Sequence, residues 1–239
     1  MSSSIVCGVD DTRHGQMAVR FAAALAERLR LRLVMVDAVA APERLYRAAA
    51  EEAAEFLLIS ARDAAGASAA PRRSSPLVTA GTAPCPIVVV PPGGTHEGLA
   101  TGSSGSIVCG IADPGDAPPM RVAVRLAREL DLALLPAHVV SDERDRLAAT
   151  TAAGVRALVS EHAAVSRSAP EALEGPAIRV GEPSRELAKL AEDSRAALLV
   201  VGCHGRGGLR SNPLSSTLLE LARASRVPLV VCPAHPQAA

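Results

Sequence analysis

Aromatic residues are scarce in this chain of 239 residues, which has two Phe, one Tyr and no Trp. Phe21, Tyr46 and Phe56 lie in periodic apolar segments, so we expect no aromatic platform on which nucleic-acid bases could stack. An excess of charge is also missing, because 25 Lys and Arg balance 25 Asp and Glu. Nucleic acid and anionic lipid are both bound through a positive excess. We therefore expect neither nucleic acid nor a membrane as a partner.

Long hydrophobic runs are absent too, since no apolar run approaches the roughly 20 residues that cross a bilayer. The first nine residues lack the basic, apolar and small-residue pattern of a secretory signal. The cysteines are widely spaced, lie in or beside apolar runs, and never approach metal-ligand spacing. Buried free thiols in a reducing compartment are the simplest interpretation, and they predict a cytoplasmic protein. These cysteines are Cys7, Cys85, Cys109, Cys203 and Cys232.

The sequence repeats itself. The IVCGV segment at 5–9 recurs as IVCGI at 107–111, an offset of 102, and Leu25-Ala26 recurs as Leu126-Ala127, an offset of 101. Further on, CPIVV at 85–89 corresponds to VPLVV at 227–231, an offset of 142. The chain therefore holds two copies of one unit, and the first is 41 residues shorter in its middle. We predict domains at 1–91 and 106–239, joined by a Gly- and Ser-rich linker at 92–105.

Short β-branched runs alternate with helical patterns in both copies, which predicts βαβ units and a mainly parallel sheet. In the first copy, Ala18, Phe21, Ala22, Leu25 and Leu29 recur at helical spacing and should face that sheet. The other expected elements of this copy are strands at 32–39, 56–60 and 86–90, and a helix at 42–55 that runs directly into its strand. The second copy should have strands at 107–111, 133–140, 178–180, 197–201 and 228–232, with helices at 119–130, within 142–164, at 183–193 and at 215–224. The first copy thus lacks the third strand.

A glycine-rich loop follows the apolar strand 197–201. It reads Gly202-Cys203-His204-Gly205-Arg206-Gly207-Gly208, and Ser215-Ser216-Thr217 then opens a helix. Glycines allow close approach of a ligand to the backbone, while hydroxyls and free N–H groups at a helix start suit phosphate oxygens. The same pattern is also typical of a simple chain reversal followed by an ordinary helix cap. Spacing alone leaves both interpretations open.

Several segments in the same order resemble the universal stress protein family. They are Gly202-x2-Gly205-x9-Ser215-Ser216, the VPLVV strand at 227–231, IRVGEP at 178–183 and VCGVD at 6–10. The resemblance covers the whole chain as a tandem pair. It implies an α/β fold of two Rossmann-like or flavodoxin-like units, of the adenine nucleotide alpha hydrolase type, with sheet order 3-2-1-4-5. It also implies pairing through the last strands, either as an intramolecular pseudo-dimer or as a homodimer.

The resemblance further implies an adenine nucleotide such as ATP, with Mg or Mn present only if ATP is bound. In ATP-binding members the glycine loop carries the phosphates, and the ends of the first two strands hold the adenosine. The corresponding positions here are Gly202, His204, Gly205, Arg206, Ser215, Ser216 and Thr217 for the phosphates, and Asp113 and Val139 for the adenosine.

The chain departs from the family pattern at several of these positions. Ser215 stands where the motif has Gly, and Ala112 stands where binding members have Asp, with Asp113 one residue later. In the first copy the loop reads Ser60-Ala61-Arg62-Asp63, so both glycines are lost and Asp63 would repel a phosphate. We therefore expect no nucleotide in the first copy and, at most, weak binding in the second.

The functional hypothesis that follows is a nucleotide-sensing regulatory module of the stress response, with no catalytic residues. One alternative is a structural or interaction protein of the same fold that has lost nucleotide binding. Another is a slow ATP hydrolase, which would need a metal ion, with Asp113 and Glu182 as possible ligands. His138 and His204 could act as an acid–base pair, but neither has an evident carboxylate partner. Cys203 is most simply a small loop residue.

Overall fold

The computed structural model describes residues 3–37, 42–61, 77, 80–92, 105–112, 117–140, 153, 154, 157, 160, 177–203 and 216–233. The side chains of Pro42, Ala117 and Ser216 are not among the described atoms. The predicted domain boundaries stay a prediction, because most of the expected linker lies outside these ranges. The helix expected within 142–164 also lies largely outside them.

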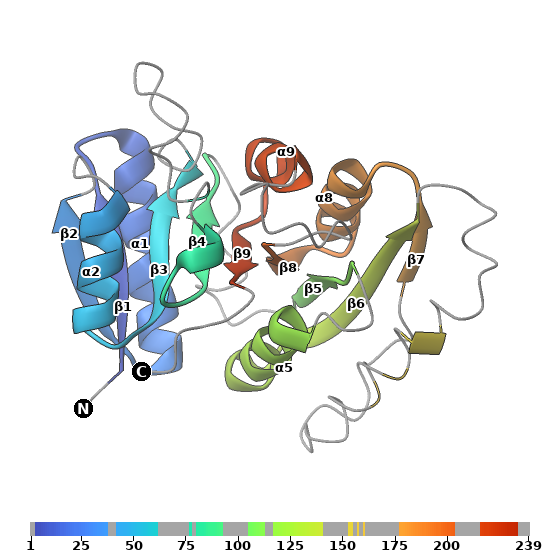
Figure 1. Cartoon of the computed structure of the whole chain (residues 1–239), viewed down its shortest axis with the longest axis horizontal. Helices are drawn as coiled ribbons and strands as arrows, with labels where there is room; N and C mark the ends of the chain where they lie inside the picture. The colour runs from blue at the N-terminus through green and yellow to red at the C-terminus, as the bar shows by residue number, and fades with distance from the viewer. Residues whose placement is uncertain are drawn as a thin grey trace.

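A nine-stranded sheet organises the described part of the chain (Figure 1). Its strands are β1 (Ser4–Val9), β2 (Arg32–Asp37), β3 (Ala54–Ser60), β4 (Ile87–Val90), β5 (Ser106–Gly110), β6 (Ala133–Val140), β7 (Ala177–Val180), β8 (Ala196–Gly202) and β9 (Leu229–Cys232). Its helices are α1 (Arg13–Leu29), α2 (Pro42–Glu51), α5 (Ala117–Leu130), α8 (Pro183–Asp193) and α9 (Ser216–Ala224), with a short 3-10 turn, η2 (Ala80–Thr82). The α/β class is confirmed.

The strand order is β2-β1-β3-β4-β9-β8-β5-β6-β7. The second half, β5 to β9, has the predicted order 3-2-1-4-5, and the first half has the same order without its third strand among the described residues. All neighbours are parallel except β4 and β9, which pair antiparallel with Val88 opposite Val230. The last strands of the two copies therefore pair within one chain, as a pseudo-dimer.

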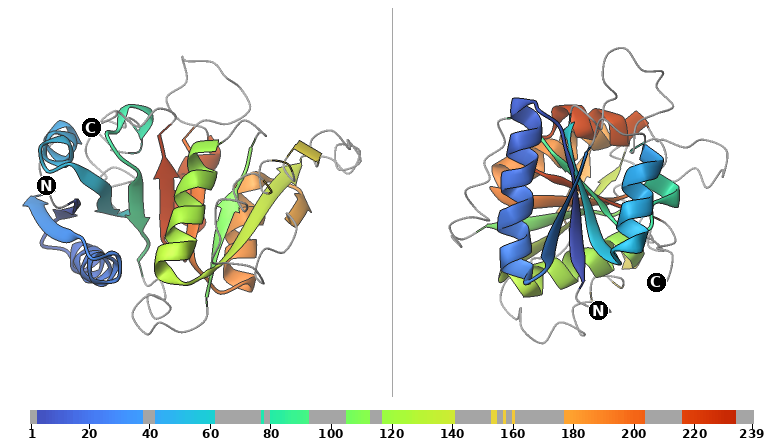
Figure 2. Two further views of the ribbon diagram at one scale, coloured as in Figure 1. Left: turned by 90° about the horizontal axis from the view of Figure 1, so that it is seen from below. Right: turned by 90° about the vertical axis from the view of Figure 1, so that its left-hand side faces the viewer.

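Helices cover both faces of the sheet (Figure 2). On one face, α1 and α5 contribute Phe21, Leu25, Met120 and Leu126 to a buried cluster. On the other face, α2, α8 and α9 contribute a second cluster that includes Leu45, Leu190 and Leu221. The helical spacing of apolar residues in α1 is confirmed, since Ala18, Phe21, Ala22 and Leu25 are buried and Leu29 packs against them. Burial of these two faces is the main contribution to stability.

The backbone repeats as the sequence does. Arg30 and Asp131, offset by 101, both adopt left-handed conformations just after a helix, with φ of 56° and 55°. Ser4 donates to the Glu52 carbonyl at 2.9 Å, and its counterpart Ser106 donates to the Ser194 carbonyl at 3.2 Å. In both copies, therefore, the first helix ends in a left-handed residue, and a serine of the first strand donates to the carbonyl of a residue that lies before the next inner strand.

One predicted helix was too long. The helix expected at 42–55 ends at Glu51, because Ala53 has φ of 47° and reverses the chain into β3. Its counterpart Arg195, with φ of 50°, does the same before β8. Strand β2 is described only to Asp37, whereas the pattern predicted it to residue 39. The remaining described boundaries differ from prediction by two residues or fewer.

Candidate functional site

The carboxyl edge of the second half-sheet holds the described part of the predicted site. Strand β8 ends at Gly202, and β5 and β6 end beside it, so Val139 lies at the same edge. Helix α9 begins at Ser216, and Thr217 in its first turn is half-buried. A glycine at a strand end and hydroxyl residues at a helix start thus belong to one edge of the sheet, where ligands of such folds bind. Five other predicted site residues lie outside the described residues: Asp113, His204, Gly205, Arg206 and Ser215.

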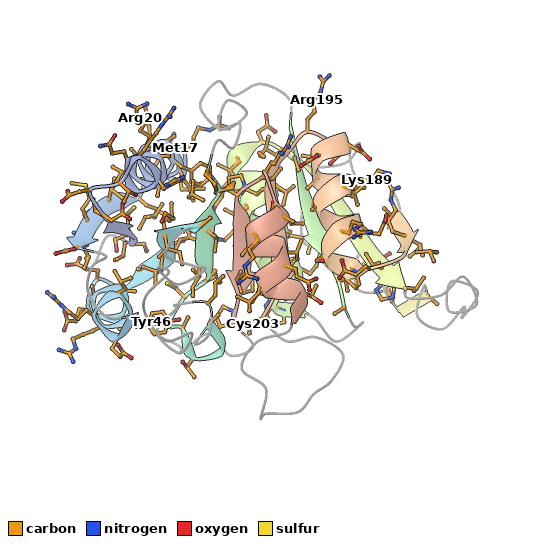
Figure 3. All side chains as sticks on the ribbon, turned by 90° about the horizontal axis from the view of Figure 1, so that it is seen from above. Met17, Arg20, Tyr46, Lys189, Arg195 and Cys203 are labelled. Carbon is orange, nitrogen blue, oxygen red and sulfur yellow. The ribbon has the colours of Figure 1, made fainter. Side chains whose placement is uncertain are left out.

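Close packing of α8 on β5 supports this edge. A Cβ atom on Gly110 would lie 2.9 Å from Leu187 Cδ1 and 3.2 Å from Val201 Cγ1. Glycine at the end of β5 therefore lets Leu187 of α8 pack directly against the strand. On the same face, α8 packs against α9 (Figure 3).

Glu182 caps α8 at this edge. Its carboxylate accepts hydrogen bonds from the backbone amides of Ser184 at 3.0 Å and Arg185 at 2.9 Å. Burial alone would raise the pKa of Glu182, but the bonds from Ser184 and Arg185 and the Arg185 charge outweigh it and lower this pKa below 4.5. The Ser184 hydroxyl also contacts the Glu182 carboxylate and lies 2.9 Å from Glu220 Oε2.

Sequence reasoning missed Glu220, which reaches this cluster from α9 across a separation of 36 residues. The only local signal for the cluster is Pro183 at the start of α8, which marks Glu182 as the capping position. Within the described part of the chain, no three residues of His, Cys, Asp and Glu are grouped as a metal ion would require.

His138 is a structural residue of β6. It is 2% exposed, and its Nδ1 lies 2.7 Å from the carbonyl oxygen of Ile111, so Nδ1 carries the proton and donates it. Its Nε2 has no hydrogen-bond partner among the described residues. Side chains at every second position of a strand point to the same face of the sheet. Leu134 lies four positions before His138 and belongs to the buried cluster under α1 and α5, so His138 faces that side. The pairing of His138 with His204 stays untested.

All five cysteines lie in the described residues, and all are buried without forming a disulfide, as the sequence predicted. Burial raises the pKa of Cys85 to about 12. Cys203 lies directly after β8 and is 6% exposed (Figure 3). Its amide donates to the Cys232 carbonyl at 2.9 Å. Its interpretation as a small structural residue fits this burial.

At the matching edge of the first half, polar side chains after β1 are hydrogen-bonded to one another. The Asp10 carboxylate at the end of β1 accepts from the Thr12 amide at 2.9 Å and from the Thr12 hydroxyl. The Thr12 hydroxyl in turn accepts from the Gly15 amide at 3.1 Å and caps α1. Ser60, which stands where the second half has Gly202, is fully buried. The Asp10 carboxylate is therefore engaged by Thr12, the residue that caps α1.

The model of the universal stress protein family matches residues 105–233, which is nearly all of the second half. The chain belongs to this family. Among solved structures, a protein of Pseudomonas aeruginosa UCBPP-PA14 assigned to the universal stress proteins has 14% identity and a TM-score of 0.62 over 97% of this chain and 93% of its own.

Two further structures share the fold over the whole chain. A functionally unknown protein of Pseudomonas aeruginosa PAO1 has 15% identity and a TM-score of 0.60, covering 97% of this chain and 92% of that one. A universal stress protein of Archaeoglobus fulgidus DSM 4304 has 15% identity and a TM-score of 0.56, and the match covers 96% of this chain and 86% of that one. No curated protein sequence matches the chain. In the described residues, no helix has both the length and the apolar character needed to span a membrane.

Proposed function

We propose that the chain is a regulatory module that senses adenine nucleotide through its second half. The observation that carries this proposal is the edge where β8 ends at Gly202 and α9 begins at Ser216. There the backbone can approach a ligand, and the free N–H groups of the first turn of α9 suit phosphate oxygens. Membership of the universal stress protein family supports the same assignment.

The phosphates would contact Gly202, Gly205 and the hydroxyls of Ser216 and Thr217, with His204, Arg206 and Ser215 in the same loop. Val139 and Asp113 would contact the adenosine from the ends of β6 and β5. The first half takes no part in binding, because its Asp10 is hydrogen-bonded to Thr12, the cap of α1, and its loop carries Asp63 where the second half has Gly205. A carboxylate at that position repels a polyphosphate.

Calorimetric titration of ATP and of AMP tests this proposal. Gly205→Asp gives the second half the residue that the first half already has, so it should abolish binding. Asp63→Gly is the matched control and should bind as the wild type does. Thr217→Val, which removes one hydroxyl donor from the first turn of α9, should weaken binding by about tenfold. Absence of heat from the wild type with both nucleotides contradicts the proposal.

A second candidate is an interaction protein that binds no nucleotide, and one observation favours it. Ala112 follows β5 where relatives that bind nucleotide have an acidic residue, so the adenosine side of the edge has lost a contact. This candidate predicts an unchanged melting temperature at millimolar ATP, whereas a bound nucleotide raises it by mass action.

Slow hydrolysis of ATP has less support. It needs a metal ion beside the phosphates, and Glu182, one of the two carboxylates considered for that role, is committed to capping α8. We therefore expect no release of ADP above the uncatalysed rate with Mg²⁺ or Mn²⁺. Release that depends on the metal and disappears in Gly205→Asp would assign the hydrolase function instead.

A further inference from the structure

A cavity of about 230 Å³ lies at the junction of the two half-sheets. Helix α5 forms one wall with Arg121, Val122 and Arg125, and the opposite walls are Glu55 of β3 and Cys232 of β9, with three prolines completing the lining. Because α5 packs with α1 on one face of the sheet, this cavity is on the opposite face from α8 and α9. It is therefore separate from the proposed nucleotide edge.

Arg125 is held in place by groups of the first half. Its Nη2 lies 2.8 Å from Glu55 Oε2, and its guanidinium lies over the Phe56 ring at 5.3 Å from the centroid. Glu129 on the same helix is 3.9 Å from Arg125 Nε. The charge of Glu55 is thus balanced by Arg125, and a guanidinium stacked on a ring is restrained at the cavity wall.

Arg121 is the second arginine of the lining. It lies four residues before Arg125, so the two side chains share one side of α5, and both residues line the cavity. Arg121 is exposed, and it forms no ion pair within the described residues. Arg125 is already paired with Glu55 and Glu129, so among the lining residues Arg121 is the cation that an incoming anion can meet.

The other side of the junction lacks this arrangement. The repeat offsets place Arg20 at the position of Arg121, but Ala24 at that of Arg125 and Ala197 at that of Glu55. Arg20 stands on α1 and points outward (Figure 3). The paired guanidinium groups and their carboxylate therefore belong to one side alone, although the two copies share a fold.

We propose that this cavity is a binding site for a small oxyanion, a carboxylate or a phosphate on a body of a few carbons. A guanidinium presents a planar fork of donors that matches either group, and Val122 and the prolines provide apolar walls for the carbons. The volume is below the roughly 300–1,000 Å³ of sites for larger ligands, so a nucleotide does not fit.

Thermal shift and calorimetry with inorganic phosphate and with propionate test the site. All variants also carry Gly205→Asp, so that the glycine loop contributes no phosphate binding. Arg121→Gln should weaken binding of whichever anion is recognised by about tenfold, the contribution of a charge-assisted hydrogen bond. Arg20→Gln removes the same charge from the matching position of the first half and should change nothing. Arg121→Lys keeps the charge but loses the fork, so it should restore binding only in part.

The two anions separate a carboxylate site from a phosphate site. Binding of propionate alone or of phosphate alone, sensitive to Arg121→Gln, assigns the ligand class. Equal losses in Arg121→Gln and Arg20→Gln would mean a general charge effect and overturn the proposal. Failure of both anions to bind at tens of millimolar would also overturn it. Because Arg121 is exposed, Arg121→Gln should fold as the wild type does, and its melting temperature without ligand verifies this.

Discussion

Arg28 of α1 donates a hydrogen bond of 2.6 Å to the carbonyl oxygen of Leu130, the last residue of α5. The bond joins the two copies, and its two residues are 102 positions apart in the chain. It satisfies one of the carbonyls that a helix end leaves without an intrahelical partner, and it places a positive charge at the negative end of the helix. The repeat puts Glu129 at the matching position of α5, so the bond cannot be reciprocated.

Arg28→Ala should lower the free energy of unfolding by about 1–2 kcal/mol, because the Leu130 carbonyl loses a charged donor. Urea denaturation measures the change. Arg20→Ala removes an exposed arginine from the same helix and should stay within about 0.5 kcal/mol of the wild type. Equal effects of the two substitutions would show that the contact with α5 contributes nothing.

Gly110→Ala should destabilise the protein by about 1–3 kcal/mol, since its methyl group would press on Leu187 and Val201. Gly105→Ala is the matched control, because its Cβ would meet nothing closer than 3.6 Å. Thermal unfolding of both variants gives the comparison. An unchanged melting temperature in Gly110→Ala would mean that α8 shifts freely over β5.

Glu182→Gln tests the cap of α8 through its dependence on pH. Because folding lowers the pKa of Glu182, its contribution is fully present above 4.5, the ordinary value, and is lost as the pH falls through the lower value of the folded state. The free energy of unfolding of the wild type should therefore exceed that of Glu182→Gln by no more than about 1 kcal/mol at neutral pH, because the carboxylate is exposed to solvent. This difference should vanish in acid.

Glu43→Gln, a loss of the same charge from the exposed first turn of α2, is the control for this comparison. Urea denaturation between pH 3 and pH 7 supplies the data. A difference between wild type and Glu182→Gln that stays constant across this range would exclude the ionised cap as its cause.

The pairing of β4 with β9 predicts a monomer. Those strands are apolar and buried, and each occupies the edge through which the other could pair with a second molecule. Light scattering should give the mass of one chain, and the melting temperature should not depend on protein concentration. A melting temperature that rises with concentration would show that copies associate.

The repeat predicted most of the sheet. Two copies at offsets of 101 and 142 determine which strands are equivalent, and the family resemblance adds their order. The end of α2 was mispredicted because Ala53 has high helix propensity, and its left-handed backbone is imposed by the approach to β3. The sequence left open whether the last strands pair within the chain, because an apolar edge strand can pair equally with a strand of the same chain or of a second molecule.

The candidate site was predictable only where residues are local in the sequence. Gly202, Ser216 and Thr217 follow from one motif, and the structure assigns Gly202 to the end of β8 and the other two to the start of α9. The contact of Glu220 with Ser184 and the ion pair of Arg125 with Glu55 join segments far apart in the chain. The spacing of residues in the sequence does not predict such pairs, because they depend on how the helices pack on the sheet.

Strand β4 gives the first copy a structural role that does not depend on a ligand. Its four residues are apolar and buried, and three of them pair with β9, so this edge of β9 is covered from within the same chain. The first copy therefore supports the fold of the second whether or not it binds a nucleotide of its own.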